Sequence, residues 1–348
     1  MLIPQTFRGT LRRPAVGPDF NLGFSGVGLL LGFCLTLATW TTAHGQEVRA
    51  ESLTDSTELV FVSQEVGQKL VSTPDDFTKH MQPLERQLRV GGDEPVDEPI
   101  YFASMKSGVL DWKEGDLSAL TNTIQRLSPK LSGLELPWPK KINLIRVSAD
   151  VEFGAPHCRA ASILLPDEFF AEPEKMETIL THELFHVLSS HNRGLRDELY
   201  GIIGFQRCDE IELPGALLGR RLTNPDAPRH EHFIELKFEN EMLPAIPVTM
   251  MRNEKPQPGG IMGNLDFKLL MLQEQDGKLV PRLKDGKPDL RGPMSTPDFM
   301  RKIGRNTGYI IHPEETMADN FWMMVLQSPN IRDTWVTEKL KAVLVKKP

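Results

Sequence analysis

The feature that most constrains this 348-residue chain is the run His-Glu-Leu-Phe-His at positions 182–186. Apolar residues recur around it at helical spacing, which predicts a helix from about residue 172 to 190. Positions four apart lie on one helical face, so His182 and His186 point the same way. Such a pair suits Zn²⁺, which binds imidazole nitrogen at about 2.0–2.1 Å. Glu183 then lies where it can act as a base toward water. The alternative is three ordinary helix residues, whose burial without a metal or partners costs several kcal/mol.

A third ligand is needed, and the nearest histidine does not provide it. His191 lies nine residues after His182. In the longer zinc pattern with a third histidine, that histidine falls at position 192 and a glycine at 189. These positions hold Asn192 and Ser189. The third ligand is therefore expected from another part of the chain.

Glu315 is the preferred third ligand. In a helix Asp319 lies one turn beyond it on the same face, where it can accept a hydrogen bond from the non-ligating nitrogen of His182. Glu314 is the alternative, but the residue four positions after it is Ala318. We therefore expect His182, His186 and Glu315 to bind zinc, with Asp319 orienting one imidazole.

These two motifs resemble those of the zincin metallopeptidases, and specifically the gluzincin branch with its thermolysin-like ligand set. The resemblance covers about residues 140–190 and 309–326, and the gap between the motifs is far longer here. It implies a zincin-like α+β fold, in which a small sheet with an edge strand packs on the active-site helix. It also implies zinc bound by His182, His186 and Glu315, with Glu183 as the general base and Asp319 supporting a ligand.

A transition-state oxyanion needs a hydrogen-bond donor opposite the metal. Tyr309 and His312 are the nearest candidates in sequence, and Tyr200 and His232 are alternatives. The segment from Tyr309 to Glu315 resembles the lethal-factor-like peptidases, in which a tyrosine shortly before the third ligand stabilises the oxyanion. Tyr309 is therefore the expected second catalytic residue. The segment that contains His232 is expected to be solvated rather than a second metal face.

Outside the motifs, the pattern divides the chain into a mainly helical region at 46–135 and a catalytic domain at 136–348. The strand at 161–165 is expected to be the sheet edge that leads into the metal-binding helix. Alternating runs and two Asp-Gly pairs predict a β-rich insertion at about 233–290. The remaining expected elements are strands at 59–62 and 141–147 and helices at about 74–90, 114–131, 195–205 and 315–326.

The first 45 residues have the pattern of a secretory signal peptide. Three arginines precede a mostly apolar run that ends at about Trp40, and small residues at Ala43 and Gly45 suit cleavage near Gly45. Removing these residues takes away three arginines and one aspartate, which changes the formal charge from −7 to −9. We therefore expect an acidic, exported protein, periplasmic or extracellular, with no stable membrane span and no nucleic-acid partner. The alternative is a signal that stays attached as an anchor.

Two cysteines, Cys158 and Cys208, remain after such cleavage, one on each side of the motif helix. In an oxidising compartment an even number favours a disulfide, and the alternative is two separate thiols. Taken together, the sequence predicts an exported zinc metallopeptidase that acts on a peptide or protein substrate. The alternatives are a zinc-retaining binding module without activity and a zinc amidohydrolase.

Overall fold

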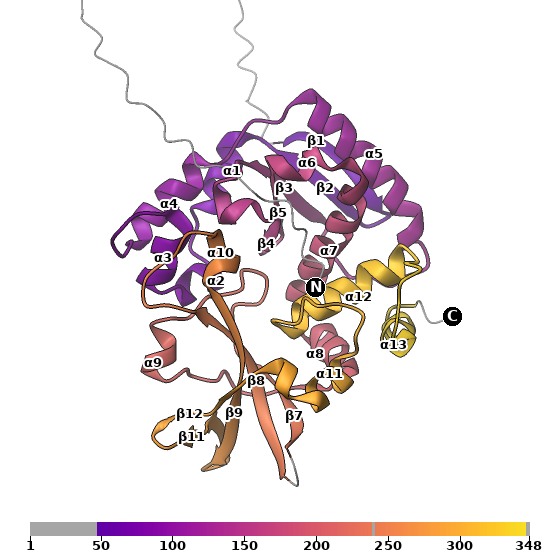
Figure 1. Cartoon of the computed structure of the whole chain (residues 1–348). Helices are drawn as coiled ribbons and strands as arrows, with labels where there is room; N and C mark the ends of the chain where they lie inside the picture. The colour runs from indigo at the N-terminus through magenta and orange to yellow at the C-terminus, as the bar shows by residue number, and fades with distance from the viewer. Residues whose placement is uncertain (1–46, 239–240, 346–348) are drawn as a thin grey trace, which may run out of the picture.

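A computed structural model describes residues 47–238 and 241–345 of the chain. It has a mixed α/β fold in which helices pack against two separate larger sheets, in agreement with the α+β class (Figure 1). The predicted signal peptide at 1–45 lies outside the described residues. Within the described ranges, no helix combines the length and the apolar character needed to cross a membrane.

The first sheet has five strands in the order β1-β2-β3-β5-β4. β2, β3 and β5 are parallel to one another, whereas β1 and β4 run antiparallel to their neighbours. The strands are β1 (Glu47–Thr54), β2 (Thr57–Val62), β3 (Lys141–Val147), β4 (His157–Arg159) and β5 (Ser162–Pro166). Since β1 and β2 share this sheet with β3, the sheet crosses the domain boundary that the sequence suggested near residue 135.

Both faces of this sheet are covered, as the apolar side chains on alternate positions of β2 show. Leu59 and Phe61 pack with helices α5 (Glu114–Leu131) and α7 (Pro173–His191) on one face. Val60 and Val62 pack on the other face with a group of shorter helices. These are α1 (Gln64–Val71), α2 (Asp76–His80), α3 (Pro83–Val90) and α4 (Glu98–Ser107). The two-residue period of a strand places successive side chains in two different cores.

The edge strand beside the motif helix is β4, not β5. β5 lies between β3 and β4, so the expectation that residues 161–165 form the edge was wrong. A 3₁₀ turn at Val151–Gly154 lets the chain form the additional short strand before β5. After β5, the short helix α6 (Asp167–Ala171) leads into α7.

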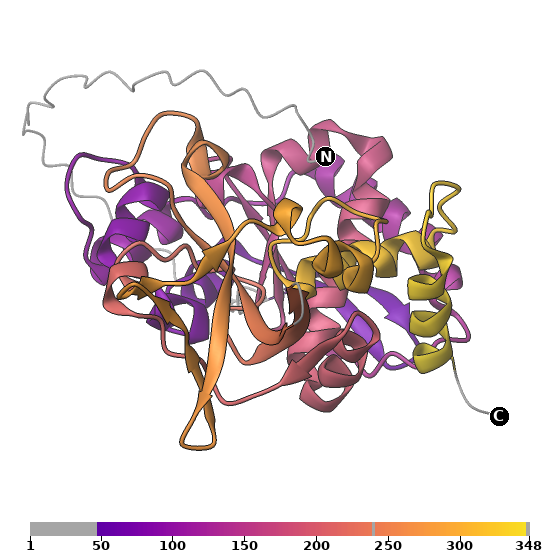
Figure 2. The ribbon, with the colours of Figure 1, turned by 60° about the horizontal axis from the view of Figure 1, so that its bottom comes forward.

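The second sheet contains the β-rich insertion, which the structure confirms. Its order is β10-β9-β8-β7-β6 with β13 also paired to β9, and all of its pairings are antiparallel. Both Asp-Gly pairs form the expected hairpin turns with positive φ, at Asp276-Gly277 and Asp285-Gly286. The strands are β6 (Phe205–Arg207), β7 (His232–Phe238), β8 (Glu241–Met251), β9 (Leu265–Gln275), β10 (Lys278–Pro281) and β13 (Leu290–Arg291). β11 (Leu283–Lys284) and β12 (Lys287–Pro288) pair only with each other, as a separate two-stranded sheet. The orange strands β8 and β9 extend away from the first sheet in both ribbon views (Figures 1 and 2).

The remaining helices lie after β5 along the chain: some come before the long strands of the second sheet, one lies between two of them, and the last three follow it. α12 packs against α7, and α13 packs against α12 and α8. They are α8 (Arg193–Ile202), α9 (Gly215–Leu218), α10 (Gly260–Asn264), α11 (Pro297–Ile303), α12 (Pro313–Val325) and α13 (Thr334–Leu344), with a 3₁₀ turn at Pro293–Ser295. The two motif-bearing helices, α7 and α12, are therefore in direct contact.

Candidate metal centre

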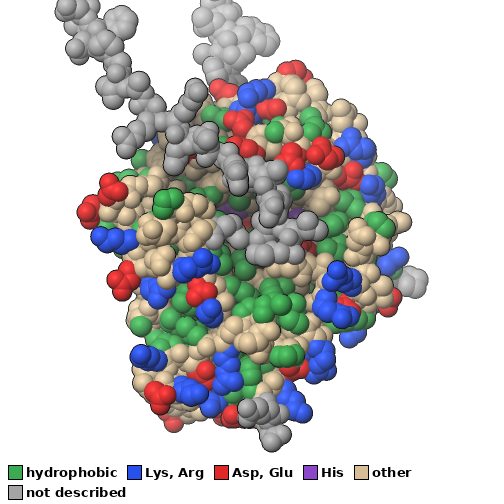
Figure 3. Space-filling view, viewed as in Figure 1, with side chains coloured by type: hydrophobic (Ala, Val, Ile, Leu, Met, Phe, Trp, Pro, Cys, Tyr) green, Lys and Arg blue, Asp and Glu red, His purple; other side chains and the backbone are tan. Residues whose placement is uncertain are grey.

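Helix α7 brings three site residues to one buried place. Pro173 occupies its first turn, where the missing N–H is harmless, and Glu174 lies at the positive end of the helix dipole. Glu183 and His186 are buried, and His182 is partly buried. Figure 3 shows histidine side chains near the middle of the viewed face. Charged side chains of both signs are distributed over the rest of that face.

Helix α12 carries the second half of the site at its first turn. Pro313 opens the helix, and the Nδ1 of His312 accepts a hydrogen bond from the backbone N–H of Glu314. Glu314 and Glu315 follow at the positive end of the helix dipole, which stabilises their negative charges. Both carboxylates are almost fully buried. This local arrangement lets two adjacent acids point into the interior.

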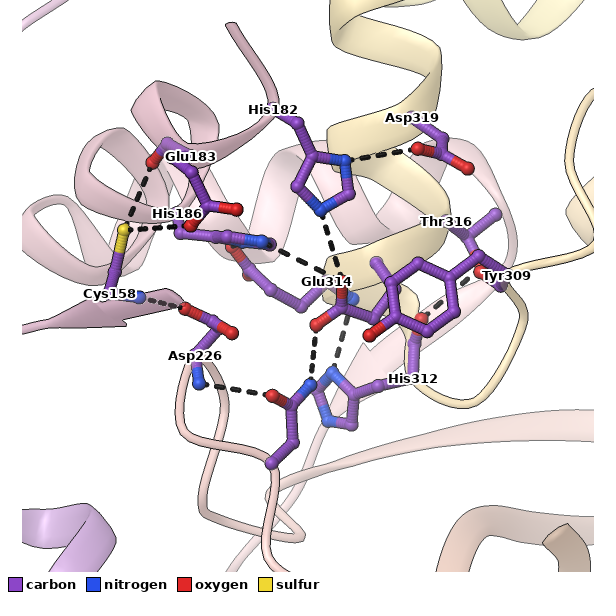
Figure 4. Close-up of polar contacts among 12 residues, drawn as sticks. Cys158, His182, Glu183, His186, Asp226, Tyr309, His312, Glu314, Thr316 and Asp319 are labelled. Carbon is purple, nitrogen blue, oxygen red and sulfur yellow. Dashed lines mark hydrogen bonds and ion pairs between the residues drawn. The ribbon is translucent and has the colours of Figure 1, made fainter. Parts of the chain in front are cut away.

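His182 lies between two carboxylates, as the sequence predicts (Figure 4). Its Nδ1 is 3.0 Å from Oδ1 of Asp319, and its Nε2 is 3.2 Å from Oε2 of Glu315. Asp319 is itself held by hydrogen bonds from the Thr307 hydroxyl and from Nε1 of Trp322. The structure therefore brings together Asp319, His182 and Glu315 in the arrangement that orients a metal-binding imidazole.

His186 has a carboxylate partner that the sequence analysis did not assign. Its Nδ1 is 2.8 Å from Oε1 of Glu314, and its Nε2 is 3.7 Å from Oε2 of Glu315. The hydroxyls of Ser189 and Tyr200 also donate to Glu314. Glu314 thus has for His186 the role that Asp319 has for His182. The signal was present in the sequence, because two ligating imidazoles require two orienting partners.

The two imidazoles converge on a single oxygen atom of Glu315. Each imidazole has its Nδ1 held by a carboxylate and presents its Nε2 to that oxygen. Candidate ligand atoms of His182, Glu183 and His186 lie within 4.8 Å of one another. Two neutral imidazoles and a carboxylate are a donor set that zinc accepts, and both histidines already have the outer partners typical of zinc sites.

The charges around the two histidines favour their protonated forms while no metal is bound. Burial alone would lower the pKa of His182, but the bonds to Asp319 and Glu315 outweigh it and raise the pKa well above its usual value. Burial likewise opposes the charged form of His186, yet the charges of Asp226 and Glu315 and the bond to Glu314 raise its pKa to about 10. The site therefore attracts positive charge strongly, which a divalent cation would provide in place of protons.

Glu183 contacts the cysteine on the edge strand. The thiol of Cys158 lies 3.4 Å from Oε2 of Glu183 and 3.2 Å from its backbone oxygen, and donates to both. Burial raises the pKa of Glu183, against the opposing charges of His186 and His182. Cys158 and Cys208 are both free, so the expected disulfide was wrong. Cys158 is instead a buried thiol beside the candidate base.

Of the four candidate oxyanion donors, Tyr309 and His312 remain available. Tyr309 lies beside His182, with the two rings nearly parallel and their centres 6.2 Å apart. Tyr200 donates to Glu314, and Nε2 of His232 lies 2.7 Å from Asp197. His232 is buried rather than solvated, contrary to expectation.

The structure adds two residues from a loop that no sequence pattern indicated. Nδ2 of Asn224 donates to Oε1 of Glu315 at 2.6 Å. Oδ1 of Asp226 accepts a hydrogen bond of 2.7 Å from the backbone N–H of Cys158. Both come from the segment 219–231 between α9 and β7.

Comparison of the chain with family models, with curated proteins and with solved structures finds no match. The geometry of the site is therefore what indicates a function for this protein.

Proposed function

We propose that this protein is an exported zinc-dependent metallopeptidase that hydrolyses peptide bonds. One observation carries the proposal: His182 and His186 each present Nε2 to the same oxygen of Glu315, while a carboxylate holds each Nδ1. Five buried or partly buried acids around two imidazoles are costly in the interior unless a cation joins them. The export part rests on the pattern of residues 1–45.

His182, His186 and Glu315 are the residues that would hold zinc. A bound zinc ion would polarise the scissile carbonyl and bring the pKa of an attacking water to about 7. Glu183 takes the proton of that water on its side-chain oxygen and passes it to the leaving amine. Burial raises the pKa of Glu183, against the charges of His186 and His182, and a raised pKa favours a carboxylate that accepts a proton.

Tyr309 is the donor that we assign to the developing oxyanion. Its ring is stacked beside His182, and burial, reinforced by the negative charge of Glu315, raises its pKa well above the usual value. The hydroxyl therefore keeps its proton and can donate it in a hydrogen bond. We assign substrate binding to the edge of β4, where an extended peptide can pair with the sheet.

Peptide cleavage by the Glu183→Gln variant tests this proposal. The variant should keep zinc and lose cleavage by about 10²–10⁴-fold, the usual contribution of a general base. Glu177→Gln on the same helix is the matched control, since Glu177 pairs with Lys130 and Arg126 away from the site. Its cleavage rate should equal that of the wild type, measured on a peptide library.

Two results would change the assignment. Unchanged cleavage by Glu183→Gln would refute the assigned base. Zinc binding without cleavage of any peptide by the wild type would favour the binding module or an amidohydrolase instead.

A further inference from the structure

The loop at 219–231 reaches the metal centre at two points. Asn224 donates to Glu315, the expected third ligand, and its Oδ1 accepts a hydrogen bond of 3.1 Å from the backbone N–H of Asp226. Asp226 in turn accepts from the backbone N–H of Cys158 on β4. Figure 4 shows the Asp226 side chain next to Cys158, on the same side of the site as His186. The loop thus connects the third ligand to the edge strand.

The carboxylate of Asp226 lies among the atoms that the proposed reaction uses. One of its oxygens is within 4.8 Å of candidate ligand atoms of His186 and Glu315. A second grouping at the same spacing joins Asp226 with Cys158 and Glu183. Asp226 therefore lies between two expected zinc ligands and the expected base, where the attacking water and the scissile carbonyl must fit.

The Asp226 carboxylate also accepts a hydrogen bond from a backbone N–H at the edge of the sheet. An extended substrate pairs with an edge strand through such N–H and C=O groups. The N–H of Cys158 is already bonded to Asp226 in this structure. A substrate and the Asp226 carboxylate cannot both use this donor.

A salt bridge with a basic side chain does not account for the position of the Asp226 carboxylate. Among the described residues, no lysine or arginine forms a salt bridge with it. The nearby Arg229 pairs with Asp76 and Glu210 instead. A cavity of about 280 Å³ adjoins the site and is lined by Asp226, His186, Cys158 and the neighbouring loop residues 225 and 227–229, among others. The carboxylate therefore has space into which it can move.

We infer that Asp226 is a fourth, displaceable metal ligand that closes the site at rest and leaves it when a peptide pairs with β4. This inference rests on the proposed function, because it assumes the zinc site of His182, His186 and Glu315. In this arrangement three ligands stay in place throughout. The fourth ligand, Asp226, competes with water and substrate for the remaining coordination position. A catalytic zinc site requires that one position become open.

The test compares Asp226→Ala and Asp226→Asn with the wild type, loaded with Zn²⁺ or with Co²⁺ as a spectroscopic probe. Zinc affinity, measured by competition with a chelator, should fall by roughly ten-fold or more in Asp226→Ala, since even outer partners contribute about that much. The visible spectrum of the Co²⁺ form should change, and peptide cleavage should become faster. Asp226→Asn keeps an acceptor for the Cys158 N–H and preserves the loop if the alanine variant does not fold. Asp209→Ala, which removes an exposed carboxylate, is the control.

The outcomes test separately whether Asp226 is a ligand, whether it is displaced and whether the zinc site exists. Equal zinc affinity and an unchanged Co²⁺ spectrum in folded Asp226 variants would overturn the fourth ligand while leaving the zinc site intact. Slower cleavage by these variants would overturn the displaceable role. A wild type that binds no zinc would instead refute the proposed function itself.

Discussion

The site is built from two kinds of structure that differ in how directly they follow from sequence. Helices α7 and α12 carry the two histidines and the three carboxylates at positions 314, 315 and 319. The loop at 219–231 contributes Asn224 and Asp226 from a segment without periodicity. On a helix, spacing fixes which side chains share a face. In a loop, the partners are known only once the chain has folded.

This contrast predicts a division of roles. The helix residues hold fixed positions in a packed interior and should supply most of the zinc affinity. The loop residues contact the same site, add to that affinity and should also control how easily the site opens, as expected for loops on a rigid scaffold.

Glu315→Ala should have the largest effect, because it removes the oxygen on which both imidazoles converge. Loss of an outer partner already costs about 10–100-fold in metal affinity, so loss of this ligand should cost more than about 100-fold. Chelator competition measures the change, and Glu338→Ala on the exposed face of α13 is the control. Zinc affinity within ten-fold of the wild type would remove Glu315 from the ligand set.

Glu314→Gln and Asp319→Asn should each weaken zinc binding by about 10–100-fold, because each loosens one imidazole. The effect should be larger for Glu314, which is fully buried and also accepts from Ser189 and Tyr200. The same titration compares the two variants. A Glu314 variant with wild-type affinity would show that His186 does not need its partner.

His157 on β4 predicts a pH dependence of the free energy of unfolding that is separate from the chemistry of the site. Burial lowers its pKa to about 3, and its Nε2 has no hydrogen-bond partner in the described part of the chain. The unfolded chain binds the proton below about pH 6.5, so stability present above that pH is lost as the pH falls toward 3. Between pH 7 and 5 this histidine should remove about 2 kcal/mol from the free energy of unfolding.

Urea unfolding of the wild type and of His157→Gln at the two pH values measures this effect. The variant should lose about 2 kcal/mol less than the wild type over that interval. Equal losses in both proteins would show that His157 titrates normally in the folded state.

Asn224→Ala should have the smallest effect of the series. It removes one hydrogen bond to the Glu315 oxygen that does not face the imidazoles. Zinc affinity should fall by less than about ten-fold, which is a smaller loss than that expected for Glu314→Gln or Asp319→Asn. A loss as large as that of Glu315→Ala would contradict the division between helix and loop.

Local patterns predicted most of the elements that position the site. The bounds of α5 match the expected helix at 114–131, and the bounds of β3 match the expected strand at 141–147. The expected helix at 74–90 is instead two helices, because Pro83 begins α3 and Met81 is extended before it. Residues 64–71, for which the sequence predicts no helix or strand, form α1 with Ser63 as its cap.

Long-range contacts account for what the sequence did not predict. The spacing to Glu315 predicts Asp319 as a partner of His182, whereas the sequence indicates Glu314 only as an alternative ligand and the structure shows it as the partner of His186. The even number of cysteines favours a Cys158–Cys208 disulfide, but Cys158 lies on an edge strand and its thiol contacts Glu183. Asn224 and Asp226 reach the site only because the folded chain brings their loop to Glu315 and to Cys158, and no spacing rule contains that information.

The zinc content of the purified wild-type protein decides whether the two histidines and Glu315 form a zinc site. Elemental analysis should find one zinc ion per chain after equilibration with Zn²⁺ and removal of the excess, and none in a folded His182→Ala/His186→Ala variant. A folded wild type that holds no stoichiometric zinc with every ligand intact would contradict this expectation.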